Sequence, residues 1–387
     1  MAAWFSVQSE VTIEPFNHVT LSYGFRYPTS VMTTYKNSGV DIREGDRASM
    51  IAYTHAASTF ASRKGMIGEP VFEKDGYAGF LDMGAYFLVQ SDDSTGSKID
   101  LAFDVGIFDT LGYDLTAMVA DDAVCTGAEP IAISNTIDVP HIDSKIIDRL
   151  MGGLAKACTE QKIAVPAGEI AEVPGAVTRG VWSATVIGIV AKDRVLKPET
   201  IKPGDVILAL RDNVARSNGF SLIRAVLSKA HGKEWFKKEW KDGKTWGAIM
   251  LTPSVIYSAA ILELIGRHGK PVQVPVKGLA HITGGGIPSK LKRVLKKSGC
   301  GAELTDLWPP HEAMTDLIKL GSVPTEEAYR TWNMGNGMLV ILEEKHAQKA
   351  LELLTKNGIQ AKQAGMVTKE SSIRIRAFDE SEVVITA

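Results

Sequence analysis

Apolar and polar residues follow two kinds of pattern in the first half of the chain. The segments Tyr86–Ser91, Pro130–Val139 and Val181–Val190 are rich in β-branched or apolar residues, which favours strands. The segments Asp109–Cys125 and Asp143–Gln161 are predicted to be helices. Strands and helices are therefore expected to mix in this half of the molecule.

The second half shows a similar mixture after a change of composition. Lys192–Gly204, with two prolines and scattered charge, predicts a linker. Strands are then expected at Val206–Leu210, Met338–Glu343 and Ser372–Phe378, with a helix at Gly219–Ala230. Two domains of α/β or α+β class are predicted, because 387 residues are too many for one ordinary core.

Three consecutive glycines, Gly284–Gly286, separate a strand-like segment from a helix-like one. Before them, Leu279, His281 and Thr283 are expected on one face of an extended chain and Ala280 and Ile282 on the other. After them, apolar residues take helical spacing at Ile287, Leu291, Val294 and Leu295. Two interpretations stay open. Bare backbone N–H groups at a helix amino end suit a phosphate, whereas a tight turn would need glycine only for its positive φ.

Composition and charge exclude several classes of protein. The chain has 45% hydrophobic and 23% charged residues with a net charge of −2, which is typical of a globular protein and gives no reason to expect nucleic acid or a membrane surface as partner. The sequence holds no apolar stretch of membrane-spanning length. Its three cysteines, Cys125, Cys158 and Cys300, lie far apart, which favours a reducing, cytoplasmic setting and argues against structural zinc.

The N-terminal 31 residues differ from the rest of the chain. They lack the basic start and continuous apolar core of a signal peptide. They are either an ordered arm or an extension upstream of a true start at Met32, and the sequence leaves both interpretations open.

Asp122 is the first candidate for chemistry. Leu115, Met118 and Val119 define the apolar face of a predicted helix, and Asp122 is expected on that face near the helix C-terminus. Burial and the helix dipole both disfavour a carboxylate there, so a metal ion, a lysine or an arginine is expected to compensate it. The alternative is a small helix rotation that sets Asp122 in water.

Two further acidic segments are predicted to be loops. "SDDSTGSK" (Ser91–Lys98) combines Asp92, Asp93 and Lys98, and "AGEIAEVPG" (Ala167–Gly175) carries Glu169. Each alone is an ordinary polar loop more often than a site. Together with Asp122 they fit Mg²⁺ coordination of a triphosphate, because Mg²⁺ uses one or two carboxylates plus waters and phosphate oxygens.

Seven motifs in order then resemble the aminoimidazole ribonucleotide synthetase (phosphoribosylformylglycinamidine cyclo-ligase) family of purine biosynthesis. The resemblance runs from about Tyr35 to the C-terminus. The motifs are "YKNSGVDI" from Tyr35, "DTLGYDLTAM…DD…GAEP" from Asp109, "GEIAEVPG" from Gly168, "SNGFSLIR" from Ser217, "LTPSVIY" from Leu251, "HITGGG" from His281 and "EAYRTWNMGNGM" from Glu327.

The resemblance implies a two-domain PurM-like fold in a homodimer, with the N-terminal sheet forming a barrel across the dimer and an α/β C-terminal domain. The expected limits are an extension or arm at 1–34, an ATP-binding and dimerisation domain at 35–195 and a second domain at 200–387. The implied reaction is the ATP- and Mg²⁺-dependent closure of formylglycinamidine ribonucleotide to 5-aminoimidazole ribonucleotide, with release of ADP and phosphate.

Site residues follow from the resemblance position by position. The implied cofactor-binding residues are Asp93, Gly96, Lys98, Asp109, Thr110, Asp122 and Glu169, of which Asp93, Asp122 and Glu169 would bind metal. The implied substrate-binding residues are Ser217, Asn218, Gly219, Thr283, Gly284, Gly285 and Gly286. Lys98, which offsets transferring charge, His281, a proton donor or acceptor, and Arg216 are the expected catalytic residues. A hydrogen-bonded structural role is the alternative for His281.

This chain departs from the family pattern at sensitive places. Asp92 and Asp121 add carboxylates, Ser94 replaces a glycine, and Ile170 replaces a hydroxyl residue. Val214 stands where a glycine is expected and Arg216 where a histidine is expected. We expect that Arg216 binds phosphate in place of lost loop contacts. The alternatives are a related ATP-dependent phosphoryl transferase with another small amide or phosphate substrate, or a non-catalytic nucleotide-binding regulator.

Overall fold

The computed structural model describes residues 42–71 and 77–386. The N-terminal segment 1–34 and nearly all of the motif Tyr35–Ile42 lie outside these residues. Within the described ranges, no helix is long and apolar enough to cross a bilayer.

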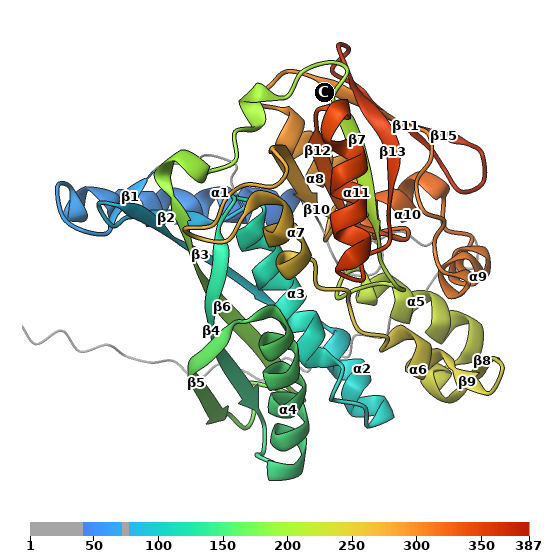
Figure 1. The fold of residues 1–387 in the computed structure, drawn as a ribbon. Coiled ribbons are helices and arrows are strands. Elements are labelled where there is room, and N and C mark those ends of the chain that lie inside the picture. Colours follow the sequence, from blue (N-terminus) through green and yellow to red (C-terminus); the bar gives the residue numbers. More distant parts are fainter. Residues whose placement is uncertain (1–41, 72–76, 387) are drawn as a thin grey trace, which may run out of the picture. The chain divides into compact units, whose positions relative to one another are not determined.

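The first sheet has six strands in the order β1-β2-β3-β6-β4-β5 (Figure 1). All neighbours are antiparallel except β4 and β5, which the helix α4 connects as a parallel crossover. The strands are β1 (Glu69–Val71), β2 (Gly79–Asp82), β3 (Tyr86–Ser94), β4 (Glu129–Val139), β5 (Ala164–Glu172) and β6 (Val181–Ala191).

Three helices belong to this sheet: α2 (Lys98–Val105), α3 (Leu111–Val124) and α4 (Ser144–Gln161). Helix α3 packs against β3, β4 and β6 and against α4, so nearly all its residues are buried. Along β6 the buried residues alternate with partly exposed ones, because only one face of the sheet is covered by α3. Within the described part of the chain, the β6 side chains of the other, open face are partly exposed.

The second sheet has seven strands in the order β10-β12-β7-β13-β11-β14-β15. All neighbours are antiparallel except β11 and β14. The strands are β7 (Val206–Arg211), β10 (Val276–His281), β11 (Gly301–Leu304), β12 (Asn336–Leu342), β13 (Ala361–Thr368), β14 (Ile373–Arg376) and β15 (Glu382–Ile385).

Helices cover both faces of this sheet, which explains the continuous apolar runs of β7 and β12. Ile207 and Ala209 pack on one side in a core shared with α5 (Phe220–His231) and α8 (Gly286–Leu295). Leu208 and Leu210 pack on the other side in a core shared with α7 (Ser258–Ile265) and α11 (Ala347–Lys356).

The remaining elements are short or peripheral. They are α1 (Ile42–Ser58), η2 (Phe60–Arg63), η3 (Lys192–Arg194), η4 (Pro198–Thr200), η5 (Trp235–Lys237), β8 (Glu239–Lys241), β9 (Lys244–Thr245), α6 (Trp246–Met250), α9 (Glu312–Gly321), α10 (Thr325–Thr331) and η6 (Glu344–His346).

The structure confirms the expected strands and helices, with two corrections. Strand β3 continues through Ser94, so half of the predicted loop "SDDSTGSK" is strand. The segment predicted as an acidic turn around Glu169 belongs to β5. The side chains of Asp92 and Ser94 on β3 and of Glu169 on β5 belong to the open sheet face, so these polar residues look like loop residues in the sequence. The domain limits at 35–195 and 200–387 stay a prediction.

Candidate functional site

The C-terminal end of α3 carries two adjacent acids in different surroundings. Asp121 is fully buried, and its Oδ1 accepts hydrogen bonds from the backbone N–H groups of Tyr257 and Ser258, both at 2.9 Å, where α7 begins. Burial raises the pKa of Asp121, although His281 and Arg216 oppose this. Asp122 is only half-buried, with 20% of its side chain exposed. The expectation that Asp122 is the core-facing acid was wrong, because α3 is buried on nearly every side and Asp121 takes that position.

Asp122 instead joins helix α3, which covers the first sheet, to the second sheet. Its Oδ1 lies 2.7 Å from Nδ1 of His281, at the end of β10. Asp93 is an exposed residue of β3, and partial desolvation of its carboxylate together with the charge of Asp122 raises the pKa of Asp93, so the two acids are close enough to interact. Lys290 on α8 also interacts with both acids, while burial lowers its pKa. We call Asp93, Asp122, His281 and Lys290 the central cluster.

The alternation of β3 separates its two acids. Asp93 pairs with Ala184 of β6, whose side chain is on the covered face, so Asp93 points toward α3. Asp92 points to the open face, where its carboxylate accepts a hydrogen bond from Thr185. Asp92 therefore does not belong to the central cluster.

Glu169 lies apart from Asp93 and Asp122 within one chain. It pairs with Thr136 of β4, which pairs in turn with Ser183 of β6 on the open face. Glu169 is thus on the opposite face from Asp93 and three strands away from β3. Among the described residues, no three acidic, histidine or cysteine side chains gather as a metal site. The structure brings Asp93 and Asp122 together, and the metal-binding role of Glu169 stays a prediction.

Asp109 and Thr110 lie at the other end of α3, about 20 Å of helix from Asp122. The Asp109 carboxylate accepts hydrogen bonds from Arg149 of α4 at 2.5 and 3.0 Å. Thr110 occupies the N-cap position of α3, and its Oγ1 is buried without a partner among the described residues. The structure does not bring this pair to the central cluster.

Lys98 is fully buried. Its Nζ lies 2.7 Å from Oδ2 of Asp114 and donates to the carbonyl of Thr252 at 2.8 Å. Burial lowers the pKa of Lys98, which Asp114 partly offsets. In this arrangement the ammonium joins α2, α3 and the 252–257 loop, so its predicted contact with a phosphate would require it to leave Asp114.

Arg216 is also fully buried, with φ of 53°. Its guanidinium is surrounded by Asp212, Asp121 and His281, and it lies over the ring of Tyr257. Burial opposes the charge, but Asp212, Tyr257 and Asp121 outweigh it and raise the pKa of Arg216. A phosphate-binding role for Arg216 stays a prediction, and the structure gives the guanidinium other partners.

The loops that carry the remaining predicted residues meet beside this network. A Cβ on Gly96 would lie 3.4 Å from the carbonyl of Ser217, so the nucleotide loop and the substrate loop are neighbours. Ser217 Oγ and Asn218 Oδ1 are buried without hydrogen-bond partners among the described residues. A Cβ on Gly219 would lie 2.3 Å from Nε1 of Trp332, which also lacks a partner there. Unpaired buried polar atoms of this kind favour a ligand or water nearby.

The three consecutive glycines have different structural roles. Gly285 and Gly286 have φ of +90° and +61°, and a Cβ on Gly286 would lie 1.9 Å from the carbonyl oxygen of Tyr329. Gly284 has ordinary φ, and a Cβ there would meet only Asn218 Nδ2, at 3.6 Å. Thr283, just before it, is buried. The turn therefore requires Gly285 and Gly286, while Gly284 leaves open backbone beside the predicted substrate loop.

We predict that Gly286→Ala lowers the free energy of unfolding by about 2–3 kcal/mol, because it adds left-handed strain and a backbone clash. Gly284→Ala, the matched control, should change stability by less than about 0.5 kcal/mol. Urea unfolding of both variants measures the difference. Equal loss in both would contradict this explanation of the turn.

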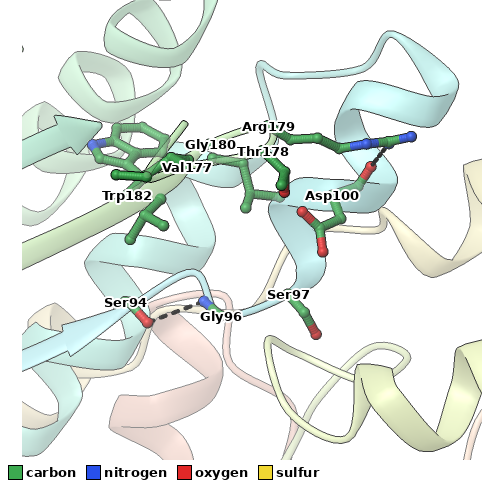
Figure 2. Close-up of a pocket in the computed structure, with 12 residues that line it drawn as sticks. Ser94, Gly96, Ser97, Asp100, Val177, Thr178, Arg179, Gly180 and Trp182 are labelled. Atoms are coloured by element: carbon green, nitrogen blue, oxygen red, sulfur yellow. Dashed lines mark hydrogen bonds between the residues drawn. The ribbon is translucent and has the colours of Figure 1, made fainter. Parts of the chain in front are cut away.

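Two hollows border the site. One of about 440 Å³ lies between Ser94, Gly96 and Ser97, at the start of α2, and the 176–182 segment that includes Arg179 (Figure 2). Figure 2 shows Ser94 Oγ accepting a hydrogen bond from the Gly96 N–H and Arg179 donating to the Asp100 carbonyl. The other, of about 570 Å³, adjoins Gly284 and Gly285 and is lined by four basic residues: Lys290, Lys292, Arg293 and Arg330. The second hollow has the composition of an anion site, whereas the first carries only Arg179 beside Asp100.

Two family models match the chain in succession. The AIR synthase related protein N-terminal domain matches residues 76–190, and the corresponding C-terminal domain matches residues 202–377. The chain is 35% identical over 347 residues to a phosphoribosylformylglycinamidine cyclo-ligase of Thermococcus kodakarensis, covering 90% of this chain and 99% of the relative. The chain belongs to the AIR synthase related family.

A second cyclo-ligase and several solved structures are also similar to the chain. The cyclo-ligase of Methanocaldococcus jannaschii is 36% identical over 345 residues, covering 87% of this chain and 92% of the relative. Among solved structures, a HypE–HypF complex matches with a TM-score of 0.59 at 18% identity, over 80% of this chain and 92% of that chain. T. maritima PurL complexed with ADP matches with a TM-score of 0.54 at 18% identity, over 81% of this chain and 46% of that chain. These likenesses show the AIR synthase fold.

Four residues of the site were not among the predicted site residues: Asp121, Asp212, Tyr257 and Lys290. A signal existed for the first. Asp121 and Arg216 are both departures from the family pattern with opposite charge, and the structure places them 3.2 Å apart. Asp212 and Lys290 lie in segments where polar residues are common, and Tyr257 ends the motif "LTPSVIY", which marked the segment but not this side chain.

The residues of the central cluster fit a magnesium ion. Asp93 and Asp122 are hard oxygen donors close enough to interact, and the bond to His281 uses only one oxygen of Asp122. Two carboxylates suffice for Mg²⁺ when phosphate oxygens supply further ligands. Such an ion would neutralise charge on a triphosphate.

Proposed function

We propose that this protein catalyses the ATP-dependent cyclisation of formylglycinamidine ribonucleotide to 5-aminoimidazole ribonucleotide, in purine biosynthesis and in the cytoplasm. The observation that carries the proposal is the central cluster, in which two acids from the first sheet and its helix meet a histidine and a lysine from the second sheet and its helix. The names of the most similar relatives support the same reaction.

The chemistry divides between the two halves of the site. Asp93 and Asp122 would hold magnesium on the triphosphate, and Lys290 would offset the negative charge that remains. The γ-phosphoryl group passes to the formyl oxygen, the amidine nitrogen attacks that carbon, and the carbon–oxygen bond breaks to release phosphate and a proton. The work of the protein is positioning and charge compensation. The basic hollow beside Gly284 suits the 5′-phosphate of the substrate.

ADP formation measured with and without formylglycinamidine ribonucleotide tests this function. We expect ADP and an aminoimidazole, detected by diazo coupling of its aromatic amine, to appear in equal amounts only with the substrate. ADP formed without the imidazole would favour the other phosphoryl transfer, and no ADP under either condition would favour a nucleotide-binding regulator.

We further propose a homodimer in which the open faces of two first sheets enclose a shared barrel. Partly exposed apolar side chains support this, because Leu88, Ile187 and Ile189 share the face that α3 does not cover. Val181 on the same face is 44% exposed. A second copy would remove these side chains from water.

Ile187→Glu is predicted to convert the dimer to monomer, since it would bury two unpaired carboxylates in the proposed interface. Met366→Glu is the matched control, because Met366 is 48% exposed on β13 of the other sheet. Sedimentation velocity at micromolar concentration measures both. If the Ile187→Glu variant forms a dimer as stable as that of the control, this face is not the dimer interface.

A further inference from the structure

His281 is held between Arg216 and Asp122, and Oδ2 of Asp121 lies 3.8 Å from its Nε2 on the side of Arg216. Its Nε2 lies 2.8 Å from Nη2 of Arg216, and its Nδ1 lies 2.7 Å from Oδ1 of Asp122. The imidazole is fully buried, whereas Asp122 retains some exposure. His281 is thus the link between a buried arginine and an acid at the edge of the site.

The proton positions follow from the chemistry of the two partners. A guanidinium only donates hydrogen bonds, so Nε2 of His281 must accept and carries no proton. The ring proton is then on Nδ1, which donates to the Asp122 carboxylate. Both short contacts are satisfied by this tautomer and by no other neutral form.

Arg216 is fixed well enough to impose this choice. Its Nη1 donates to Asp212 and, at 3.2 Å, to the carbonyl of Val255, and its Nη2 also lies 3.2 Å from Asp121. Asp121 is in turn held by the first backbone N–H groups of α7. The guanidinium therefore cannot turn away from His281 without leaving buried carboxylates unpaired.

We propose that Arg216 locks His281 as a hydrogen-bonded bridge that orients Asp122 toward the cation, and that His281 transfers no proton in the reaction. Arg216 and His281 are then positioning residues that act through Asp122. The hydrogen bond from His281 uses Oδ1 of Asp122, so Oδ2 is left to bind the cation. This inference rests on the proposed function only in assigning the cation to Asp122, and it replaces the expectation that His281 is a proton donor or acceptor.

Two substitutions at one position test the bridge. His281→Gln keeps one donor and one acceptor on a planar group, whereas His281→Leu keeps neither. We expect His281→Gln to retain Mn²⁺·ATP affinity and turnover within about 10-fold of the unmodified protein, and His281→Leu to lose about 10–100-fold in Mn²⁺·ATP affinity. His311→Gln is the control, because His311 caps α9 through its Nδ1 and lies outside the central cluster.

The outcome separates positioning from proton transfer. A glutamine variant that keeps its Mn²⁺·ATP affinity but loses turnover by on the order of 10²–10⁴-fold would identify a proton-transfer residue and overturn the proposal. Unchanged affinity in His281→Leu would overturn it as well. Electron paramagnetic resonance of Mn²⁺ provides the affinity without turnover, so failure to cyclise the substrate would affect only the proposed function.

The tautomer has a direct signature. In ¹⁵N-labelled full-length protein, the ring nitrogens of His281, assigned by loss of its signals in His281→Gln, should show a protonated Nδ1 and an unprotonated Nε2. Protonation at Nε2 would overturn the proposal regardless of any activity. This measurement uses the unmodified protein, so it does not depend on whether an Arg216 variant folds.

Discussion

Asp122→Asn should lower turnover by about 100-fold or more while the protein stays folded, because the neutral amide keeps the shape of the side chain but is a poor ligand for Mg²⁺. Asp122 is half-buried, and its Oδ1 bond to His281 can be kept by the amide oxygen. The loss should therefore appear in nucleotide-dependent chemistry and not in the unfolding midpoint. Steady-state kinetics at saturating substrate, together with urea unfolding, measures the two effects separately.

Asp148→Asn is the control for this prediction. Asp148 is an exposed acid on α4 outside the central cluster, and its substitution should leave turnover unchanged. Turnover of Asp122→Asn equal to that of the control would remove Asp122 from the metal site.

Lys98→Met should lower the free energy of unfolding by about 3–5 kcal/mol, the usual effect of removing one partner of a buried ion pair. The loss arises because Asp114 stays buried without its cation, although Ser254 still donates two hydrogen bonds to it. Burial already raises the pKa of Asp114 with Lys98 present, so the carboxylate is costly to leave unpaired. Urea unfolding of the variant measures the loss.

A double variant separates folding from catalysis at Lys98. Lys98→Met with Asp114→Leu removes both charges and should recover much of the lost stability, since an apolar pair can replace a buried ion pair. If Lys98 also acts on the transferring phosphoryl group, the recovered protein stays inactive in single turnover. Normal single-turnover chemistry in a stable double variant would limit Lys98 to a structural role.

Much of the fold could be predicted because local patterns and tertiary packing agree. Helix α4 begins where Asp143 accepts a hydrogen bond from the Lys145 N–H, a capping preference visible in the sequence. Strands β7 and β12 are apolar throughout because helices cover both faces of their sheet, and such runs are easily recognised. Strand β10 and helix α8, on either side of the triple glycine, lie where the side-chain pattern changes from strand to helical spacing.

The site was harder to predict because the local sequence does not show which face of a sheet or helix each polar side chain will occupy. Asp92 and Asp93 are neighbours in sequence, yet the pleat sends them to opposite sides of the first sheet. Glu169 resembles a turn residue and is in fact exposed on an edge strand. The pairing of Asp121 with Arg216 joins residues 95 positions apart, and only the packing of α3 beside α7 and the loop after β7 creates it.

The central claim is that Asp93 and Asp122 hold the metal ion of a bound nucleotide beside the triple-glycine turn. A crystal structure of the protein with Mn²⁺ and a non-hydrolysable ATP analogue tests this most directly. We predict anomalous manganese density in contact with both carboxylates and the phosphates, with the terminal phosphate facing Gly284. Manganese and nucleotide bound away from Asp93 and Asp122 would contradict the account.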